Sequence, residues 1–466
     1  MHATSVTIHR AGALRTPGGG LDVEAYKRAV GALLHRVPRY RQKLRRVPFE
    51  RNPVWIDDPH FNLDYHIRHA SLPRPGSVEE LKKKVARIQV QPLDRGKPLW
   101  ESWLIEGLEG DRFAVIRKLH HCMLDAEHPE DLAELLLAGE GARSGAIPRY
   151  LPRPEPTGIE LLGDAWKRRL LRPFDALGRL RDFARASENL RSELAERASA
   201  LAAQLVGATR RPLDSPLSGA IGPHRRVDWF SSSLDDLKAL RRALGCSLHD
   251  VVLATLAGAV RDFFLYRHLD PEAVAFRVST PVGAGAGHHP RVSSWQLELP
   301  IGEPDPLARA RRIREETERL RESRHALGVE TMLGLAEWTP SVLLSLGARA
   351  LASPVPAQLT LMSVPGPVQR RSLLGCELLE WYAAYPLLEP TGLSIALVSY
   401  CGRMGWCFNA DRDLVPDLAR FVKGVESAFE ELSRAAGVDV KGLPAEAGPR
   451  RAASRGRASA RRAPAG

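Results

Sequence analysis

The order of apolar and polar positions predicts strands and helices in the first half of the chain. Ser77-Val78-Glu79-Glu80 has the spacing of a helix capping box, and we expect a helix from there to about Gln89. Residues 112–119 alternate in the manner of a strand, and residues 129–137 then have the pattern of a helix with acidic residues at its start. His120-His121 is therefore expected where a strand ends.

The second half of the chain repeats this mixture of elements. The apolar spacing predicts a helix over residues 248–266, a strand over 275–282 and a basic helix over 307–322. Residues 393–408 are typical of a hairpin that turns at Gly402-Arg403. Because both halves combine strands with helices, we expect an α/β protein with two domains of similar size.

Composition marks the edges of these domains. Residues 146–157 are rich in proline, which is typical of a linker or domain edge. The chain end lacks the apolar residues of a core and is expected to be disordered. The predicted units are an N-terminal domain at 1–150, a helical linker at 151–215, a C-terminal domain at 216–442 and a basic tail at 443–466.

The linker contains a basic stretch, residues 166–206, with the apolar spacing of a helix. Two interpretations remain open. A basic amphipathic helix can lie on an anionic membrane surface or bind an acidic partner. Alternatively, the stretch is a connecting helix whose charged face is solvated.

Charge and composition exclude several classes of protein. The 466 residues carry a net charge of +12, but the tail contributes six arginines without an acidic residue after Glu446, so the body is only mildly basic. A 44% hydrophobic and 26% charged composition is that of a globular protein and argues against a coiled coil or a mainly disordered chain. No apolar run approaches the roughly 20 residues of a membrane span.

Leader and cysteine patterns point to the cytoplasm. The first residues show no charged leader followed by a long apolar segment, so we expect no secretory signal. The five cysteines are scattered and form no C-x-x-C pair, so neither a disulfide framework nor a zinc site is expected. We predict a cytoplasmic protein that holds no metal.

A compact group of motifs surrounds the predicted strand end. His120-His121-Cys122-Met123-Leu124-Asp125-Ala126 follows Pro92-Leu93-Asp94-Arg95 and Pro98-Leu99-Trp100. This order resembles the bacterial wax ester synthase/diacylglycerol acyltransferase (WS/DGAT) family, whose signature is HHxxxDG after a PLDR…PLW segment. Further matches in the family's order are Asn62-Leu63-Asp64-Tyr65-His66, Asp250-Val251-Val252-Leu253-Ala254, Val364-Pro365-Gly366-Pro367 and Ala410-Asp411-Arg412-Asp413. The resemblance covers about residues 1–432.

The resemblance implies a fold and a reaction. The fold would be two domains like the coenzyme A-dependent acyltransferases, each a mixed sheet flanked by helices, with the active site in a tunnel between them. The reaction would esterify diacylglycerol or a long-chain alcohol with an acyl group from acyl-CoA, a substrate, without a further cofactor. Such a transfer needs a base that takes the alcohol proton, and imidazole titrates near neutral pH.

The resemblance assigns the role of general base to His121, which leaves His120 a positional role. Asp125 either shapes the site by pairing with an arginine or caps the next helix, and both interpretations remain open. A covalent mechanism through Cys122, activated by His121, is a less favoured alternative.

Other residues are expected to support the site. Pro98, Leu99 and Trp100 would form its wall, although Trp100 is equally well explained as plain core. His249 stands where the family has an asparagine that helps to shape the catalytic centre from the second domain. Asp250 belongs to the same motif, but Ser247 and Asp250 also have the spacing of a capping box.

The chain departs from the family in four motifs. Besides His249, Ala126 replaces a glycine, Pro290 stands before Arg291 where Gly-Asn is usual, and Ser363 replaces an asparagine before Val364. These changes leave open whether activity is retained. The second hypothesis is thus a catalytically impaired relative that binds a lipid or a partner, and a third is transfer from a carrier-protein thioester, because peptide-condensing domains share HHxxxD.

The expected partners follow from this hypothesis. They are acyl-CoA, diacylglycerol or a long-chain alcohol, and a peripheral contact with the inner membrane or lipid inclusions, with no specific nucleic acid. Met1-His2 aligns with an internal Met-His of the family. Two explanations are open: the true start lies upstream, or part of the wall of the first domain is missing.

Overall fold

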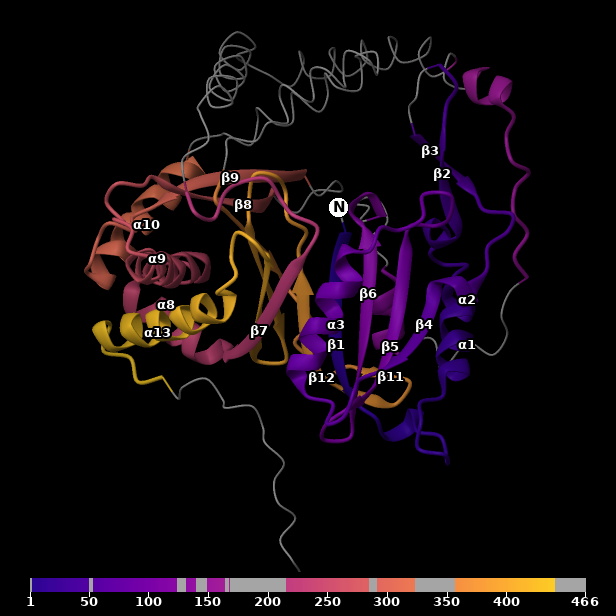
Figure 1. Cartoon of the computed structure of the whole chain (residues 1–466), viewed down its shortest axis with the longest axis horizontal. Helices are drawn as coiled ribbons and strands as arrows, with labels where there is room; N and C mark the ends of the chain where they lie inside the picture. Colours follow the sequence, from indigo (N-terminus) through magenta and orange to yellow (C-terminus); the bar gives the residue numbers. More distant parts are fainter. Residues whose placement is uncertain are drawn as a thin grey trace, which may run out of the picture.

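The computed structural model describes residues 2–49, 53–123, 131–139, 149–163, 167, 215–284, 291–322 and 357–440. In these ranges the strands form two six-stranded sheets and one two-stranded sheet. The first sheet has the order β11-β12-β1-β6-β5-β4, and the second has the order β7-β14-β13-β10-β8-β9. Helices α1 and α2 lie on the outer side of the first sheet, α3 lies between the two sheets, and α8, α9, α10 and α13 gather on the outer side of the second (Figure 1).

The first half of the chain combines strands with helices, as the sequence predicts. They are β1 (His2–Arg10), α1 (Val23–Leu33), β2 (Gln42–Arg46), β3 (Pro53–Asp57), α2 (Leu63–His66), β4 (Ile67–Ser71), α3 (Val78–Val90), β5 (Trp100–Leu108), β6 (Arg112–His120) and α4 (Leu132–Leu137). Short 3₁₀ turns accompany them in the described ranges: η1 (Gly12–Leu14), η2 (Pro38–Arg41) and η3 (His121–Met123).

The second half continues the mixture. Its elements are β7 (Arg225–Ser233), α8 (Leu234–Leu244), α9 (Leu248–Tyr266), β8 (Phe276–Ala284), β9 (Arg291–Leu299), α10 (Pro306–Glu322), β10 (Leu359–Val364), β11 (Ser372–Leu373), β12 (Cys376–Ala384), β13 (Leu393–Tyr400), β14 (Arg403–Asp411) and α13 (Leu418–Ala435). The α/β class and the two-sheet architecture of the sequence prediction are confirmed.

Local signals placed several of these elements correctly. Ser77 caps α3 by accepting a hydrogen bond from the Glu80 amide, and α9 has the predicted bounds. The predicted hairpin is β13–β14, but it turns one residue earlier, at Cys401-Gly402, where both residues have positive φ angles (45° and 79°). The helix expected from residue 129 is shorter within the described residues, because α4 begins after Asp131.

Sheet membership departs from the predicted domain ranges. Strands β11 and β12 come from the range assigned to the C-terminal domain, yet they belong to the first sheet (Figure 1). Strand β12 pairs antiparallel with β1, with Thr4 opposite Ala384. Since β6 pairs with the other edge of β1, the first strand is central only because the second half supplies this partner.

Three apolar clusters hold the described parts together. One surrounds α9, which is buried over most of its length, and a second lies beneath α1 and α4. The third joins the two halves, because Leu81, Val85 and Ile88 of α3 share it with Val227 and Trp229 of β7. This contact sets the two sheets side by side. The predicted tunnel between the domains remains a prediction.

In the described residues, no single helix is long and apolar enough to cross a membrane, and only the pair α8–α9, bent by 94°, meets the length and composition criteria jointly. The basic stretch 166–206 and the tail from Leu443 lie outside the described residues, apart from Lys167.

Candidate active site

The His120-His121 pair lies where β6 ends, as expected. His120 is the last residue of the strand and His121 begins η3. The His120 amide donates a hydrogen bond to the Leu99 carbonyl at 3.0 Å. Pro98, Leu99 and Trp100 are buried, so the Pro-Leu-Trp motif is a rigid support beside the histidines.

The His120 ring is held in place by its own turn. The Cys122 amide donates to His120 Nδ1 at 3.3 Å, and the Cys122 Sγ lies 3.0 Å from the same nitrogen. The ring of His2, paired with His120 in the sheet, meets it edge-on with centroids 5.8 Å apart. Burial lowers the pKa of His120, and the positive charge of Arg95 acts in the same direction. His120 is therefore a neutral, fixed side chain.

The His121 ring is exposed and faces a tyrosine from the other half of the chain. Its Nε2 lies 3.3 Å from the Tyr385 hydroxyl, and the two rings are nearly perpendicular, with centroids 6.1 Å apart. Burial raises the pKa of Tyr385, so its hydroxyl keeps its proton at neutral pH. No local pattern singles out Tyr385, whose signal in the sequence is only a Tyr-Pro pair after the alternating β12.

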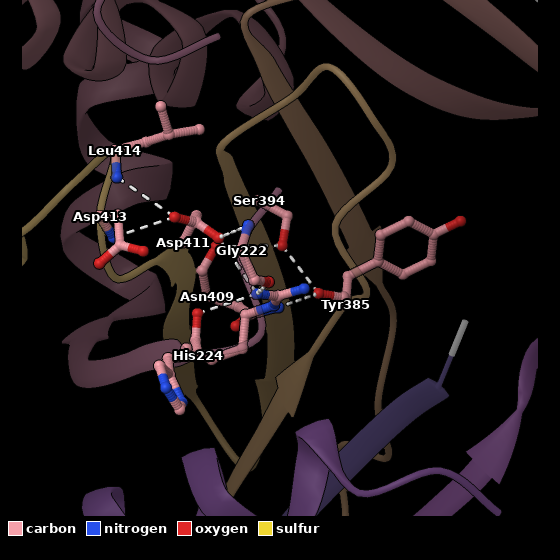
Figure 2. Close-up of polar contacts among 9 residues, drawn as sticks. Gly222, His224, Tyr385, Ser394, Asn409, Asp411, Asp413 and Leu414 are labelled. Atoms are coloured by element: carbon pink, nitrogen blue, oxygen red, sulfur yellow. Dashed lines mark hydrogen bonds and ion pairs between the residues drawn. The ribbon is translucent and has the colours of Figure 1, made fainter. Parts of the chain in front are cut away.

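Two buried side chains hold the backbone of Tyr385 (Figure 2). The Ser394 hydroxyl and the Asn409 Nδ2 each donate to the Tyr385 carbonyl at 2.8 Å. Ser394 and Asn409 face each other on β13 and β14 and are each 1% exposed. The second sheet thus presents Tyr385 to the histidine motif of the first.

The Ala410-Asp411-Arg412-Asp413 motif secures the end of β14. The buried Asp411 carboxylate accepts hydrogen bonds from the amides of Gly222, Asp413 and Leu414 at 2.8, 2.9 and 3.2 Å (Figure 2). It also forms an ion pair with Arg225 at 3.2 Å. The sequence located this motif, and the structure gives Asp411 a tethering role.

Of the two interpretations of Trp100, a wall of the site or plain core, its contacts are those of a core residue. It is 2% exposed, its indole N–H donates to the Tyr40 carbonyl at 2.8 Å, and its ring stacks on His66 with centroids 4.6 Å apart. The His66 Nδ1 lies 2.8 Å from the Trp100 carbonyl. Burial lowers the pKa of His66 to about 4, so the imidazole is neutral and donates to this carbonyl.

An ion pair secures the segment that follows the histidine motif. Asp131, which precedes α4, accepts from Arg117 of β6 at 3.1 Å and from the Tyr40 hydroxyl at 2.6 Å. Although burial favours the protonated acid, Arg117 and Tyr40 lower the pKa of Asp131. Sequence patterns do not predict this pair, since its only signal is an aspartate at the N-cap of an apolar helix. Asp125 and Ala126 lie outside the described residues.

Asp250 has a structural role at the start of α9. Its carboxylate accepts from the Ser247 amide at 2.8 Å while the Ser247 hydroxyl accepts from the Asp250 amide at 3.1 Å, which confirms the predicted capping box. Its other oxygen accepts from Thr317 of α10 at 2.9 Å.

The neighbouring His249 has no hydrogen-bond partner at its buried Nε2 in the part of the chain that the structure describes. Burial lowers its pKa.

The remaining predicted residues are placed only in part. Arg291 begins β9 opposite Ala284, but its side chain is not among those described. Ser363 is exposed on β10, and Pro290 lies outside the described ranges. Among the described residues, no group of three or more His, Cys, Asp or Glu side chains could hold a metal ion.

Comparison with known sequences supports the family resemblance. The profile of the wax ester synthase/diacylglycerol acyltransferase catalytic domain matches residues 1–252, and that of the WS/DGAT C-terminal domain matches residues 291–433. A Mycobacterium tuberculosis protein named a probable diacylglycerol O-acyltransferase is 28% identical over 431 residues, which cover 89% of each chain. A second M. tuberculosis protein, also named a diacylglycerol O-acyltransferase, is 29% identical over 95% of this chain and 93% of its own.

Solved structures share the fold. A wax ester synthase/diacylglycerol acyltransferase from Marinobacter aquaeolei matches with a TM-score of 0.61 and 22% identity over 94% of this chain and 95% of its own. The first condensation domain of the calcium-dependent antibiotic synthetase matches with a TM-score of 0.55 and 16% identity over 95% and 92% of the two chains.

Proposed function

The chain belongs to the wax ester synthase/diacylglycerol acyltransferase family, and from this premise we propose that it transfers an acyl group from acyl-CoA to the hydroxyl of diacylglycerol or a long-chain alcohol. Relatives that match this chain along nearly their whole length are named as diacylglycerol O-acyltransferases, which supports this proposal. They do not favour the alternative of a catalytically impaired binding protein. The motif departures at Ala126, His249, Pro290 and Ser363 then concern acceptor preference or rate.

One observation carries the assignment of the base. His121 offers an exposed imidazole at the end of a rigid strand, with its Nε2 facing a hydroxyl group at 3.3 Å. A general base must lie within hydrogen-bond reach of the hydroxyl whose proton it takes, and this contact, which is often longer in the absence of substrate, is close to that reach. In the proposed reaction, an acceptor hydroxyl takes the place of the phenol.

The reaction then needs no covalent intermediate and no cofactor. The acceptor oxygen attacks the thioester carbonyl while His121 takes its proton, the carbon–sulfur bond breaks, and the proton passes to the leaving CoA thiolate. His120, neutral and hydrogen-bonded to its own turn, has a positioning role. Burial raises the pKa of Cys122, and its sulfur lies beside His120 instead of His121, which argues against a Cys–His nucleophile.

Thiol release from palmitoyl-CoA by the purified protein tests this proposal, with diacylglycerol or hexadecanol as acceptor. His121→Ala should lower acceptor-dependent release by about 10²- to 10⁴-fold, the usual contribution of a general base. His60→Ala, at an exposed histidine outside the motif, serves as the control and should keep wild-type activity. Undiminished transfer by folded His121→Ala would refute the assignment.

We further propose that the protein works in the cytoplasm as a peripheral protein at the inner membrane or at lipid inclusions. The apolar acceptors and the basic stretch 166–206 support this location. Flotation with anionic vesicles that contain diacylglycerol should recover the protein at physiological salt. Protein that stays at the bottom of the gradient would contradict the proposal.

A further inference from the structure

The Tyr385 hydroxyl occupies the nitrogen that the proposed reaction needs. A neutral imidazole has one nitrogen that accepts a hydrogen bond, and it accepts from one hydroxyl at a time. Since burial keeps the Tyr385 phenol protonated, the phenol donates to His121 Nε2 whenever that nitrogen carries no proton. An acceptor alcohol or a water molecule can reach the base only after this hydroxyl has moved.

The backbone of Tyr385 is held by two hydrogen bonds, whereas its hydroxyl has one partner in the described residues. Ser394 and Asn409 hold the carbonyl from two neighbouring strands, as Figure 2 shows. Within the described residues, the phenolic hydroxyl has no hydrogen bond other than that with His121. Moving the hydroxyl therefore breaks one hydrogen bond and leaves the attachment of the residue to the second sheet intact.

We propose that Tyr385 is a positioning residue that reserves His121 for the acceptor alcohol and suppresses hydrolysis of acyl-CoA. This inference rests on the proposed function, because it takes His121 as the base. In the absence of an acceptor, water bound at Nε2 would attack the thioester, the carbon–sulfur bond would break, and the products would be a fatty acid and CoA thiol. The Tyr385 hydroxyl competes with that water for the same nitrogen.

A long-chain alcohol or diacylglycerol displaces the phenol more readily than water does. Its hydroxyl arrives on an apolar chain whose burial supplies free energy that water lacks. The competition thus selects for acceptors with apolar tails. The same competition lowers the apparent affinity of the enzyme for the alcohol, because the hydrogen bond between Tyr385 and His121 must first break.

Tyr385→Phe removes the competing hydroxyl and keeps the ring. Thiol release from palmitoyl-CoA without an acceptor should rise about five-fold, the factor that corresponds to the net contribution of one hydrogen bond. The KM for hexadecanol should fall by a similar factor while kcat changes little. Tyr382→Phe is the matched control, because Tyr382 lies on β12, just before Tyr385, and its hydroxyl donates to Glu380 at 2.8 Å. This variant should divide acyl-CoA between transfer and hydrolysis as the wild type does.

A second measurement does not depend on turnover. Diethyl pyrocarbonate modifies unprotonated imidazole nitrogens, and peptide mapping gives the rate at His121. The rate should be several-fold higher in Tyr385→Phe than in the wild type or in Tyr382→Phe, because Nε2 is then free.

The outcomes separate this inference from the proposed function. Suppose that His121→Ala abolishes transfer, but that Tyr385→Phe has the wild-type ratio of hydrolysis to transfer and the wild-type rate of diethyl pyrocarbonate modification at His121. The inference is then wrong and the proposed function stands. Loss of transfer in folded Tyr385→Phe would also overturn it, since the phenol would then take part in the reaction. Full transfer by His121→Ala would refute the proposed base and this inference together.

Discussion

The buried histidines lie in sites that suit only the neutral imidazole. His66 stacks between Phe61 and Trp100, with interplanar angles of 14° and 13°, and is 1% exposed. His9 is fully buried against Phe113. Burial lowers the pKa of both to about 4 because a charged ring would lose its hydration. Two histidines thus make the stability of the protein sensitive to acid.

His66→Phe should make stability less dependent on pH. The unfolded chain binds a proton at each of these histidines near pH 6.5, whereas the folded protein does so only near pH 4, so stability falls as the pH drops from 6.5 to 4. Each unit of pKa shift corresponds to about 1.4 kcal/mol. Urea unfolding at pH 7, 5.5 and 4.5 should show a smaller decline in His66→Phe than in the wild type, although the variant loses about 1 kcal/mol at pH 7 with its hydrogen bond to Trp100.

His60→Gln, which removes an exposed imidazole, provides the control and should follow the wild-type curve. A decline in His66→Phe as steep as in the wild type would show that His66 does not titrate in this range.

At the scale of elements, the end of β6 is tied to α4 by charge. Arg117 of β6 and Tyr40 of η2 both contact Asp131 at the start of α4. The chain between β6 and α4 contains the His121 motif, so the ion pair limits how far the two ends of that segment can separate. Sequence patterns found β6 and α4, but their attachment depends on Tyr40, 91 residues before Asp131.

Asp131→Asn should destabilise the protein by about 1–3 kcal/mol, because it leaves the Arg117 charge without its partner. Acceptor-dependent transfer should fall as well, since the histidine motif loses its tether. Glu134→Gln, an exposed position in α4, is the matched control and should change stability by less than about 0.5 kcal/mol.

The contribution of the Asp131 charge also has a defined pH range. Because the folded protein lowers the pKa of Asp131, the contribution is complete above about pH 4 and disappears as the pH falls through the lowered value. Denaturant unfolding of both variants at pH 7 and pH 3 checks this. Equal stabilities of Asp131→Asn and Glu134→Gln at pH 7 would contradict the tether.

At the scale of the whole molecule, the two halves share a sheet and an ion pair. Strand β12 completes the first sheet, and α3 packs on β7 through the apolar cluster between the halves. At the edge of that cluster, Lys82 Nζ lies 2.6 Å from Asp228 and 5.6 Å from the centre of the Trp229 ring. Burial alone would lower the pKa of Lys82, but Asp228 raises it, so the charged pair persists.

Asp228→Asn should lower the free energy of unfolding by about 1–3 kcal/mol and weaken the contact between the halves. The reason is that the buried ammonium group of Lys82 then loses part of the negative charge that balances it. Glu80→Gln breaks the exposed pair with Lys83, which has a similar distance of 2.7 Å on the same helix, and should cost less than about 1 kcal/mol. Calorimetry compares the two variants. Equal shifts of the unfolding temperature would show that the pair between Lys82 and Asp228 contributes no more to stability than the exposed pair.

The sequence by itself determined the local features of this protein. The Ser77 cap of α3, the capping box of α9, the alternation of β6 and the β13–β14 hairpin each depend on a few neighbouring residues, so short patterns were sufficient. The ordered motifs located the family and placed His120 and His121 at a strand end. They also suggested Asp250 and Trp100 as site residues. In the structure, Asp250 makes the contacts of a helix cap and Trp100 those of a core residue.

Only the tertiary structure decided which distant segments meet. Tyr385 lies 264 residues from His121, and no local pattern indicates their contact. Its position follows from the pairing of β12 with β1 and from the hydrogen bonds of Ser394 and Asn409. The partners of a strand or of a buried charge depend on which faces fit once the chain has closed its long loops, and that choice involves the whole molecule rather than any short stretch of it.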